Sequence, residues 1–404
     1  MTGAPSPLRV CNVITHLEVG GATEAAINAC AHVDAERFTT ALVCGPSPAG
    51  ERDARPLADE LGVEVVVIPS LVRPIRPGRD LGAVRALRRT FRSWRPDIVH
   101  THSSKAGFLG RLAARREDVA GIVHTVHGWS FHDHMTRSTR AFYVGLERRA
   151  ARWTDRLVTV SELDRRKGLS AGIGAPDRYT VVRELNDVGR FLAADHNPAE
   201  ALRRLGLARD QPVVGTLGRL SEQKDPATFV RTAAAISVQV PDARFVMIGD
   251  GPLRPEVERL AADLGLHDRF LVTGVLRDVA EVLPALDVFV LTSRWEGMPL
   301  VLPQAMASEV PVVASTADGN RELVHDGDNG LLAPPGAPDA FAEHAVRLLR
   351  DPSLRERLVT AGRQTARGFT LDETVPRLER VYRECAGSPA AETEDVTKRS
   401  PEDP

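Results

Sequence analysis

Short apolar runs alternate with segments of helical periodicity along two successive halves of this sequence, and this alternation limits the fold more than any other feature. It is typical of a parallel sheet that helices cover on both faces. At 404 residues the chain is long enough to bury a separate core in each half. We therefore predict the α/β fold class, with two doubly wound parallel sheets facing each other across a central cleft. Strands are predicted at Leu8–Thr15, Thr40–Cys44, Val63–Ile68, Asp97–His102, Gly121–His127, Arg156–Val160 and Tyr179–Val182, and then at Pro212–Leu217, Arg244–Ile248, Phe270–Thr273, Asp287–Thr292, Pro311–Ala314 and Gly330–Leu332.

The same pattern divides the chain into parts. We predict one domain at residues 1–185 and a second at 186–369, with 186–197 as the connection because it lacks apolar periodicity. Helical periodicity over 370–385 predicts a C-terminal helix that can pack back on the first domain. Residues 386–404 are rich in Pro, Ser, Glu, Thr and Asp, and we predict that they are disordered.

Composition excludes several classes of protein. Hydrophobic residues at 43% and charged residues at 26% are ordinary for a soluble globular protein, and a net charge of -2 argues against a dedicated nucleic-acid binder. No metal-ligand spacing links Cys11, Cys30, Cys44 and Cys385, so we expect free thiols in a reducing compartment. The first residues show no signal-peptide pattern, and no run of about eighteen apolar residues is present. We predict a cytoplasmic protein.

Residues 73–95 form the most charged stretch of the first half. Asp80 is placed to cap a helix whose apolar residues repeat at helical spacing, and arginines fall on another side of that helix. Two interpretations stay open: a solvated helix face, or a basic surface that contacts an anionic membrane or an anionic acceptor. The arginines concerned are Arg73, Arg76, Arg79, Arg85, Arg88, Arg89, Arg92 and Arg95.

One histidine stands at the end of a predicted strand. His127 is followed by glycine, and because the carboxyl ends of strands border the cleft in a doubly wound sheet, we predict that it is a site residue. His132, Asp133 and His134 come shortly after it. Their spacing matches no familiar metal-ligand pattern and no second cluster completes it, so we predict no metal site.

Two loops of the second half carry cations and glycines at strand ends. Arg219 and Lys224 follow Gly218 and lie beside a predicted helix start, where two cations suit a diphosphate better than one. Residues 249–252 read Gly-Asp-Gly-Pro, a turn that permits close approach of the backbone. Because both loops follow strands of one parallel sheet, they are expected at the same edge of that sheet.

The stretch 293–307 adds a carboxylate at the same edge. Glu296 and Gly297 lie in the turn after an apolar strand, and Pro299 is placed in the first turn of the next helix, which its fixed φ suits. Backbone N–H groups at such a turn favour an anion, and a carboxylate is a good partner for hydroxyl donors. Together with the neighbouring cations, this stretch predicts a site for a nucleotide diphosphate that carries a group rich in hydroxyls.

At these motifs the sequence resembles the family-4 retaining glycosyltransferases of the GT-B fold, which have two Rossmann-like domains. The resemblance extends over nearly the whole ordered chain and is strongest over 218–332. In the first half it rests on Gly20-Gly21, Val99–His102 and Thr125–Gly128. It implies that the first domain binds an acceptor and that the second binds a nucleotide-sugar donor.

The resemblance implies a role for each matching residue. Arg219 and Lys224 would neutralise the donor diphosphate and stabilise the leaving group. Glu296 would bind hydroxyls of the donor sugar, and His127 would contact that sugar from the opposite domain. These four are the expected catalytic residues. The expected donor-binding residues are Gly20, Gly21, Gly218, Gly297, Met298, Pro299, Leu300 and Gln304.

The implied reaction moves a hexose-type sugar from a nucleotide diphosphate, with UDP as the expected nucleotide, to a hydroxyl of a glycan, a lipid-linked acceptor or a small molecule. No cofactor and no metal are expected. Retention would proceed by front-face attack with a phosphate oxygen as the base, and domain closure would exclude water. The implied partners are therefore the donor and the acceptor, with peripheral contact to an anionic membrane through 73–95 as a further interpretation.

The sequence departs from the family pattern at three points. Gln304 stands where a second glutamate usually binds the ribose hydroxyls, so we predict weaker or altered nucleotide binding, because an amide lacks charge-assisted strength. Residues 184–187 read Glu-Leu-Asn-Asp where relatives often have Asn-Gly, and Ser308-Glu309 replaces a common glycine. Two alternative functions stay open: a non-catalytic partner protein that binds a nucleotide sugar, and a sugar-nucleotide epimerase of similar architecture.

Overall fold

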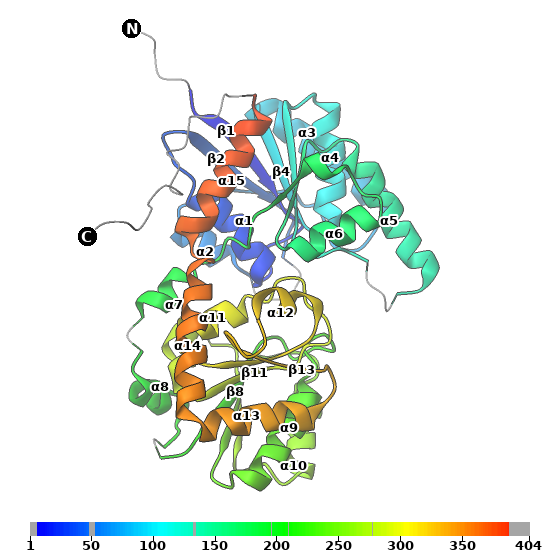
Figure 1. Cartoon of the computed structure of the whole chain (residues 1–404). Coiled ribbons are helices and arrows are strands. Elements are labelled where there is room, and N and C mark those ends of the chain that lie inside the picture. The colour runs from blue at the N-terminus through cyan, green and yellow to red at the C-terminus, as the bar shows by residue number, and fades with distance from the viewer. Residues whose placement is uncertain are drawn as a thin grey trace, which may run out of the picture.

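The computed structural model describes residues 6–47, 53–131, 135–194, 196–208, 210–276 and 278–387. It has two α/β domains stacked along the long axis of the molecule (Figure 1). The predicted fold class is confirmed: each domain contains one parallel sheet with helices on both faces.

The first domain contains a seven-stranded sheet with the strand order β3-β2-β1-β4-β5-β6-β7, and all of its strand pairs are parallel. The chain order reverses beside β1, and a doubly wound sheet binds ligands at such a switch point. The strands are β1 (Leu8–Val13), β2 (Phe38–Cys44), β3 (Val65–Val67), β4 (Ile98–His102), β5 (Gly121–Val126), β6 (Arg156–Thr159) and β7 (Tyr179–Val181). The helices are α1 (Gly21–Ala31), α2 (Arg55–Glu60), α3 (Pro77–Trp94), α4 (Ser104–Arg116), α5 (Arg137–Ala151) and α6 (Glu162–Ser170), with a 3-10 helix at Pro176–Arg178.

The second domain contains a six-stranded parallel sheet in the order β10-β9-β8-β11-β12-β13. The strands are β8 (Val213–Leu217), β9 (Arg244–Ile248), β10 (Phe270–Gly274), β11 (Val288–Leu291), β12 (Val312–Ser315) and β13 (Leu331–Ala333). The helices are α7 (Gly189–Ala193), α8 (Pro198–Leu205), α9 (Pro226–Gln239), α10 (Arg254–Asp263), α11 (Val301–Ala307), α12 (Asp318–Leu323), α13 (Pro338–Arg350) and α14 (Pro352–Arg367), with 3-10 helices at Val279–Glu281 and Leu283–Ala285.

Strand β11 shows why these sheets need continuous apolar runs. Val288 and Val290 belong to one buried cluster, whereas Phe289 and Leu291 belong to another on the opposite face of the sheet. Side chains of a strand alternate between faces, so a central strand of a sheet covered on both sides buries successive positions. The strand is therefore held from both faces, which fixes the loop that follows its carboxyl end.

Helix α15 (Leu371–Cys385) returns the chain to the first domain, where it lies along that domain's outer surface (Figure 1). Val375, Leu378 and Val381 join a buried cluster with residues of β1, β4 and β5. The hydroxyl of Tyr382 lies 2.7 Å from Nδ1 of His100 on β4. The predicted disordered tail lies outside the described residues from residue 388 onward.

Helix α3 differs locally from the prediction. It begins at Pro77, so Asp80 lies within its first turn and is not the N-cap. Proline suits this first position because its missing N–H would have no partner inside the helix. Asp80 instead accepts a hydrogen bond from the backbone N–H of Arg76 at 3.1 Å.

One further prediction is wrong, at the start of α11. Helix α11 begins at Val301, so Pro299 precedes it, and Pro303 is the proline of its first turn. The stretch 186–197 contains the short helix α7, whose Phe191 is fully buried against the second domain. A helix this short with one buried aromatic residue has no repeating apolar pattern by which the sequence could reveal it.

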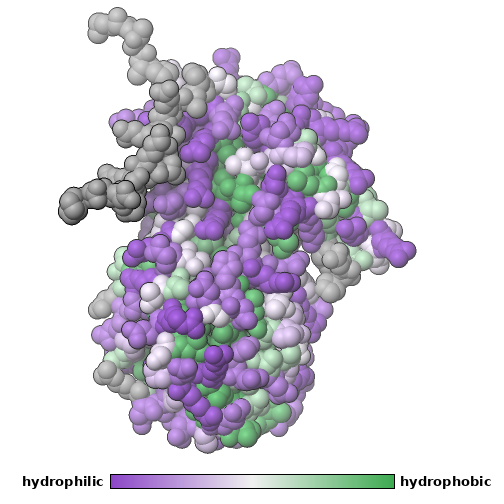
Figure 2. Space-filling view, viewed as in Figure 1, coloured by the Kyte–Doolittle hydropathy of each residue, from purple (hydrophilic) through white to green (hydrophobic). Residues whose placement is uncertain are grey.

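The exterior of the face seen in Figure 2 is mainly hydrophilic, and hydrophobic residues appear there in small separate groups. Among the described residues, no helix is both long and apolar enough to cross a bilayer. The four cysteines are free thiols, as predicted, and Cys11, Cys30 and Cys44 are buried.

Candidate active site between the domains

The loops at the carboxyl ends of both sheets meet between the domains. A Cβ atom added to Gly297, in the loop after β11, would lie 3.0 Å from the carbonyl oxygen of His127, which follows β5. A Cβ atom on Gly21 would lie 2.7 Å from Cδ1 of Leu300. Predicted residues of the two domains are therefore in direct contact, and glycine at these positions permits the close approach.

Lys224 and Glu296 form an ion pair inside the second domain. Nζ of Lys224 lies 2.6 Å from Oε1 of Glu296, whose side chain is only 5% exposed. Gln223 donates from Nε2 to Oε2 of Glu296 at 3.3 Å and to the carbonyl of Trp295 at 3.1 Å. The predicted phosphate-binding cation and the predicted sugar-binding carboxylate thus neutralise each other.

Arg219 has a partner in the other domain. Its guanidinium lies 3.1 Å from Oε1 of Glu18, a residue of the β1–α1 loop. Glu18 also lies 3.3 Å from Nε2 of His16 and 3.5 Å from the guanidinium of Arg73. The sequence prediction missed Glu18, and its one signal is an acidic residue two positions before Gly20.

A second carboxylate joins the domains at α6. Glu322 of α12 accepts hydrogen bonds from the backbone N–H groups of Glu162 and Leu163, at 2.7 and 2.9 Å. These N–H groups have no partner inside the helix, so the carboxylate caps α6 from the opposite domain. Nearby, burial raises the pKa of Asp164 to about 6, although its hydrogen bond with Ser161 opposes this shift.

His127 is held by a chain of polar side chains. Its Nδ1–H donates to the carboxylate of Glu184 at 2.9 Å, and its Nε2 lies 3.0 Å from Nδ1 of His102. Nε2 of His102 in turn lies 3.0 Å from Oδ1 of Asn12. A carboxylate only accepts hydrogen bonds, so Glu184 fixes the proton of His127 on Nδ1 and orients the ring. The sequence prediction missed Glu184 and Asn12 as site residues.

The other strand histidines are structural. Burial lowers the pKa of His100 to about 3 and holds the pKa values of His102 and His124 well below their usual range. His100 bonds to Tyr382 and to Oγ1 of Thr125, each at 2.7 Å. Within the described ranges no group of three or more His, Cys, Asp or Glu residues is placed to hold a metal ion. His132, Asp133 and His134 lie outside those ranges.

The other motifs of the second domain that the sequence singled out follow its strands β8, β9 and β11. The 249–252 turn packs against the loop after Gly218, where the N–H of Leu220 donates to the carbonyl of Asp250 at 3.0 Å. Met298 is buried. Gln304 is half-buried on α11, and its side chain forms no hydrogen bond with another described residue.

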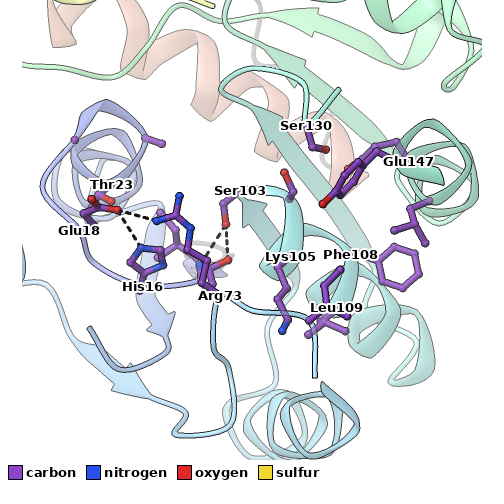
Figure 3. A pocket seen from close by; sticks show the side chains of 18 of the residues that line it. His16, Glu18, Thr23, Arg73, Ser103, Lys105, Phe108, Leu109, Ser130 and Glu147 are labelled. Atoms are coloured by element: carbon purple, nitrogen blue, oxygen red, sulfur yellow. Dashed lines mark hydrogen bonds and ion pairs between the residues drawn. The ribbon is translucent and has the colours of Figure 1, made fainter. Parts of the chain in front are cut away.

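A cavity of about 820 Å³ adjoins this site in the first domain. Gly20, Gly21 and Arg219 line it, so it reaches the interdomain cleft. In Figure 3, His16, Glu18 and Arg73 lie at one end and Ser130 and Glu147 at the other, with Lys105, Phe108 and Leu109 of α4 between them. The buried carboxylate of Glu147 pairs with the fully buried Arg111 at 2.8 Å. A cavity of this size beside paired charges suits a second substrate.

Two parallel-sheet domains with this interdomain site define a GT-B glycosyltransferase. Residues 20–183 match the family described as glycosyl transferase 4-like domain, and residues 211–351 match glycosyl transferases group 1. The chain belongs to the family-4 glycosyltransferases.

Individual relatives agree with this assignment. The chain is 33% identical over 352 residues to the Escherichia coli UDP-Gal:alpha-D-GlcNAc-diphosphoundecaprenol alpha-1,3-galactosyltransferase, covering 86% of this chain and 89% of that protein. It is 34% identical over 305 residues to a D-inositol 3-phosphate glycosyltransferase of Actinosynnema mirum, covering 71% and 72% of the two chains. The crystal structure of Anabaena HepE in complex with UDP-glucose is similar in fold, with a TM-score of 0.79, 20% identity, and coverage of 93% of this chain and 100% of that chain.

Proposed function

We propose that this enzyme transfers a hexose with retention from a UDP-sugar bound by the second domain to a hydroxyl of an acceptor held in the first domain. The observation that carries the proposal is the convergence of Lys224, Glu296 and Arg219 with His127 at the cleft between the domains. The Escherichia coli relative is named for a UDP-sugar donor, and the HepE structure contains UDP-glucose, which support UDP as the nucleotide.

The two ion pairs support a diphosphate site. Lys224 is paired with Glu296, and Arg219 with Glu18. A donor diphosphate would compete for both cations and leave Glu296 free to accept hydrogen bonds from sugar hydroxyls. Glu18 would be released toward Arg73 and His16, which already contact it. Donor binding is therefore coupled to the wall of the acceptor cavity.

The reaction exchanges one bond at the anomeric carbon. The bond from this carbon to the diphosphate oxygen breaks, and the acceptor hydroxyl oxygen bonds to the same face. The hydroxyl proton passes to an oxygen of the leaving diphosphate. Arg219 and Lys224 stabilise the negative charge that develops on this leaving group, so no step in the scheme requires a metal ion. Closure across Glu18 and Glu322 excludes water.

The proposal is tested by a donor screen that follows release of the nucleoside diphosphate. UDP-hexoses are compared with ADP- and GDP-hexoses in the presence of soluble glycans and of lipid extracts. We expect release of UDP that depends on acceptor, and NMR of the product should show the anomeric configuration of the donor. Donor binding without release would favour a partner protein, an isomerised free donor would favour an epimerase, and an inverted product would contradict retention.

Replacing Gln304 by glutamate is expected to tighten UDP binding about fivefold, because hydrogen bonds to a charged group contribute roughly 1 kcal/mol more than neutral ones. Calorimetry with UDP and ADP measures the affinity and the base preference. Gln239→Glu is the matched control, since Gln239 is exposed at the end of α9. If Gln304→Glu behaves like that control, Gln304 does not face the nucleotide.

A further inference from the structure

Exposed hydrophobic residues gather at the cavity of the first domain. Val19, Ile75 and Phe142 are 46%, 61% and 53% exposed, and all three line this cavity. They come from the β1–α1 loop, the loop before α3 and helix α5. Leu81, at 47% exposure, follows the cavity residue Asp80. Exposed apolar groups that converge from separate elements mark a binding surface rather than scattered surface residues.

The charged groups inside the cavity are already paired. Lys105 lies 2.6 Å from Oδ1 of Asp80, and Arg73 and Arg219 both contact Glu18. These pairs leave little net charge within the cavity to attract a small soluble anion. Such an anion would also leave the exposed apolar residues in water.

Positive charge without a carboxylate partner lies outside, beside the apolar rim. Arg76 and Arg79 are exposed and lie between Ile75 and Asp80, which both line the cavity. They form no ion pair with another described residue. Farther along α3, Glu117 pairs with both Arg88 and Arg92. Arg85, Arg89 and Arg95 are exposed and form no ion pair with another described residue. Among these unpaired arginines, Arg76 and Arg79 lie nearest in the sequence to Ile75 and Asp80, which line the cavity.

We propose that the acceptor is a saccharide joined through phosphate to a long hydrocarbon chain, with the saccharide in the cavity and the chain leaving across Val19, Ile75 and Phe142. The phosphate then lies near Arg76 and Arg79, where a membrane-bound anion meets cations at an apolar surface. This inference rests on the proposed function, since it names the acceptor of the same reaction. A small soluble phosphate is a poorer candidate for the acceptor. Among the described residues, the cations that line the cavity are all paired with carboxylates and so are not available to bind it.

The test measures binding of the full chain to phosphatidylcholine vesicles that contain a long-chain polyprenyl phosphate. Co-flotation is compared for the wild type and for Ile75→Ser/Phe142→Ser. We expect the variant to bind at least about tenfold more weakly, because two half-exposed apolar side chains lose their contacts with the hydrocarbon chain. Val238→Ser/Leu264→Ser is the matched control, since both residues are exposed hydrophobic residues of the second domain.

UDP binding is measured in every variant, because the substituted residues are not among the predicted donor-binding residues. If the wild-type protein does not bind UDP, the proposed function is contradicted. If it binds UDP but not the vesicles, only the proposed acceptor is overturned. Equal binding to phosphatidylglycerol vesicles of the same charge density would overturn it by showing a general anionic surface. Equal competition by inorganic phosphate would overturn it in favour of a small anion. Tight binding that only the Ile75/Phe142 variant loses supports it.

Discussion

Replacing both Arg219 and Lys224 by alanine is expected to lower kcat/KM by at least about 10³-fold, because each cation stabilises charge that develops on the leaving diphosphate. The loss should appear in kcat as well as in KM, since this charge is larger in the transition state than in the bound donor. Steady-state measurement of UDP release from the donor identified by the screen gives both parameters.

Two exposed arginines provide the control for this double variant. Arg231 and Arg259 belong to the same domain and form no ion pair with another described residue, so Arg231→Ala/Arg259→Ala removes equal charge away from the cleft. Lys224→Ala also strands the buried carboxylate of Glu296, so circular dichroism and thermal melts must show that the fold persists. Transfer by a folded Arg219/Lys224 variant at the rate of the control would contradict both assigned roles.

The fold was predictable because the strands are short, mainly apolar runs separated by helical segments. The residues from Val288 to Leu291 alternate between the two buried faces of a sheet, so all four must be apolar. This unbroken apolar run is the signal by which the strand is recognised in the sequence. Helix ends were less predictable. Asp80 and Pro299 were assigned to the wrong helical positions because capping depends on one or two residues, whereas apolar periodicity is summed over a whole element.

The second domain's part of the site was predictable from one rule. The carboxyl ends of parallel strands share an edge, so Lys224 after β8 and Glu296 after β11 were expected together, and they form a 2.6 Å ion pair. Contacts between the domains were not predictable, because periodicity says nothing about how two sheets face each other. Glu18 and Arg219 are 201 residues apart and belong to different domains. Within the first domain, periodicity also gives no sign of the contact between Glu184 and His127, which are 57 residues apart. Sequence reasoning named His127 and Arg219 without the carboxylates that hold them.

Replacing Arg111 by methionine is expected to destabilise the first domain by about 3–5 kcal/mol, because it leaves the buried carboxylate of Glu147 without its charged partner. The same change at Arg115, an exposed residue of α4 paired with exposed Asp118, should cost less than about 1 kcal/mol. Equilibrium urea unfolding followed by tryptophan fluorescence measures both, since three of the four tryptophans, Trp94, Trp129 and Trp153, belong to the first domain.

The cost belongs to the stranded charge and not to the lost side-chain volume, so a second change should reverse most of it. Arg111→Met/Glu147→Leu removes both charges, and its free energy of unfolding is expected to lie within about 1–2 kcal/mol of the wild-type value. Because Glu147 lines the cavity, the double variant should keep the fold while altering acceptor binding, and UDP affinity should stay unchanged. A double variant as unstable as Arg111→Met would instead assign the cost to the hydrogen bond that Arg111 donates to the carbonyl of Gly107 and to packing, and the buried pair would then contribute little.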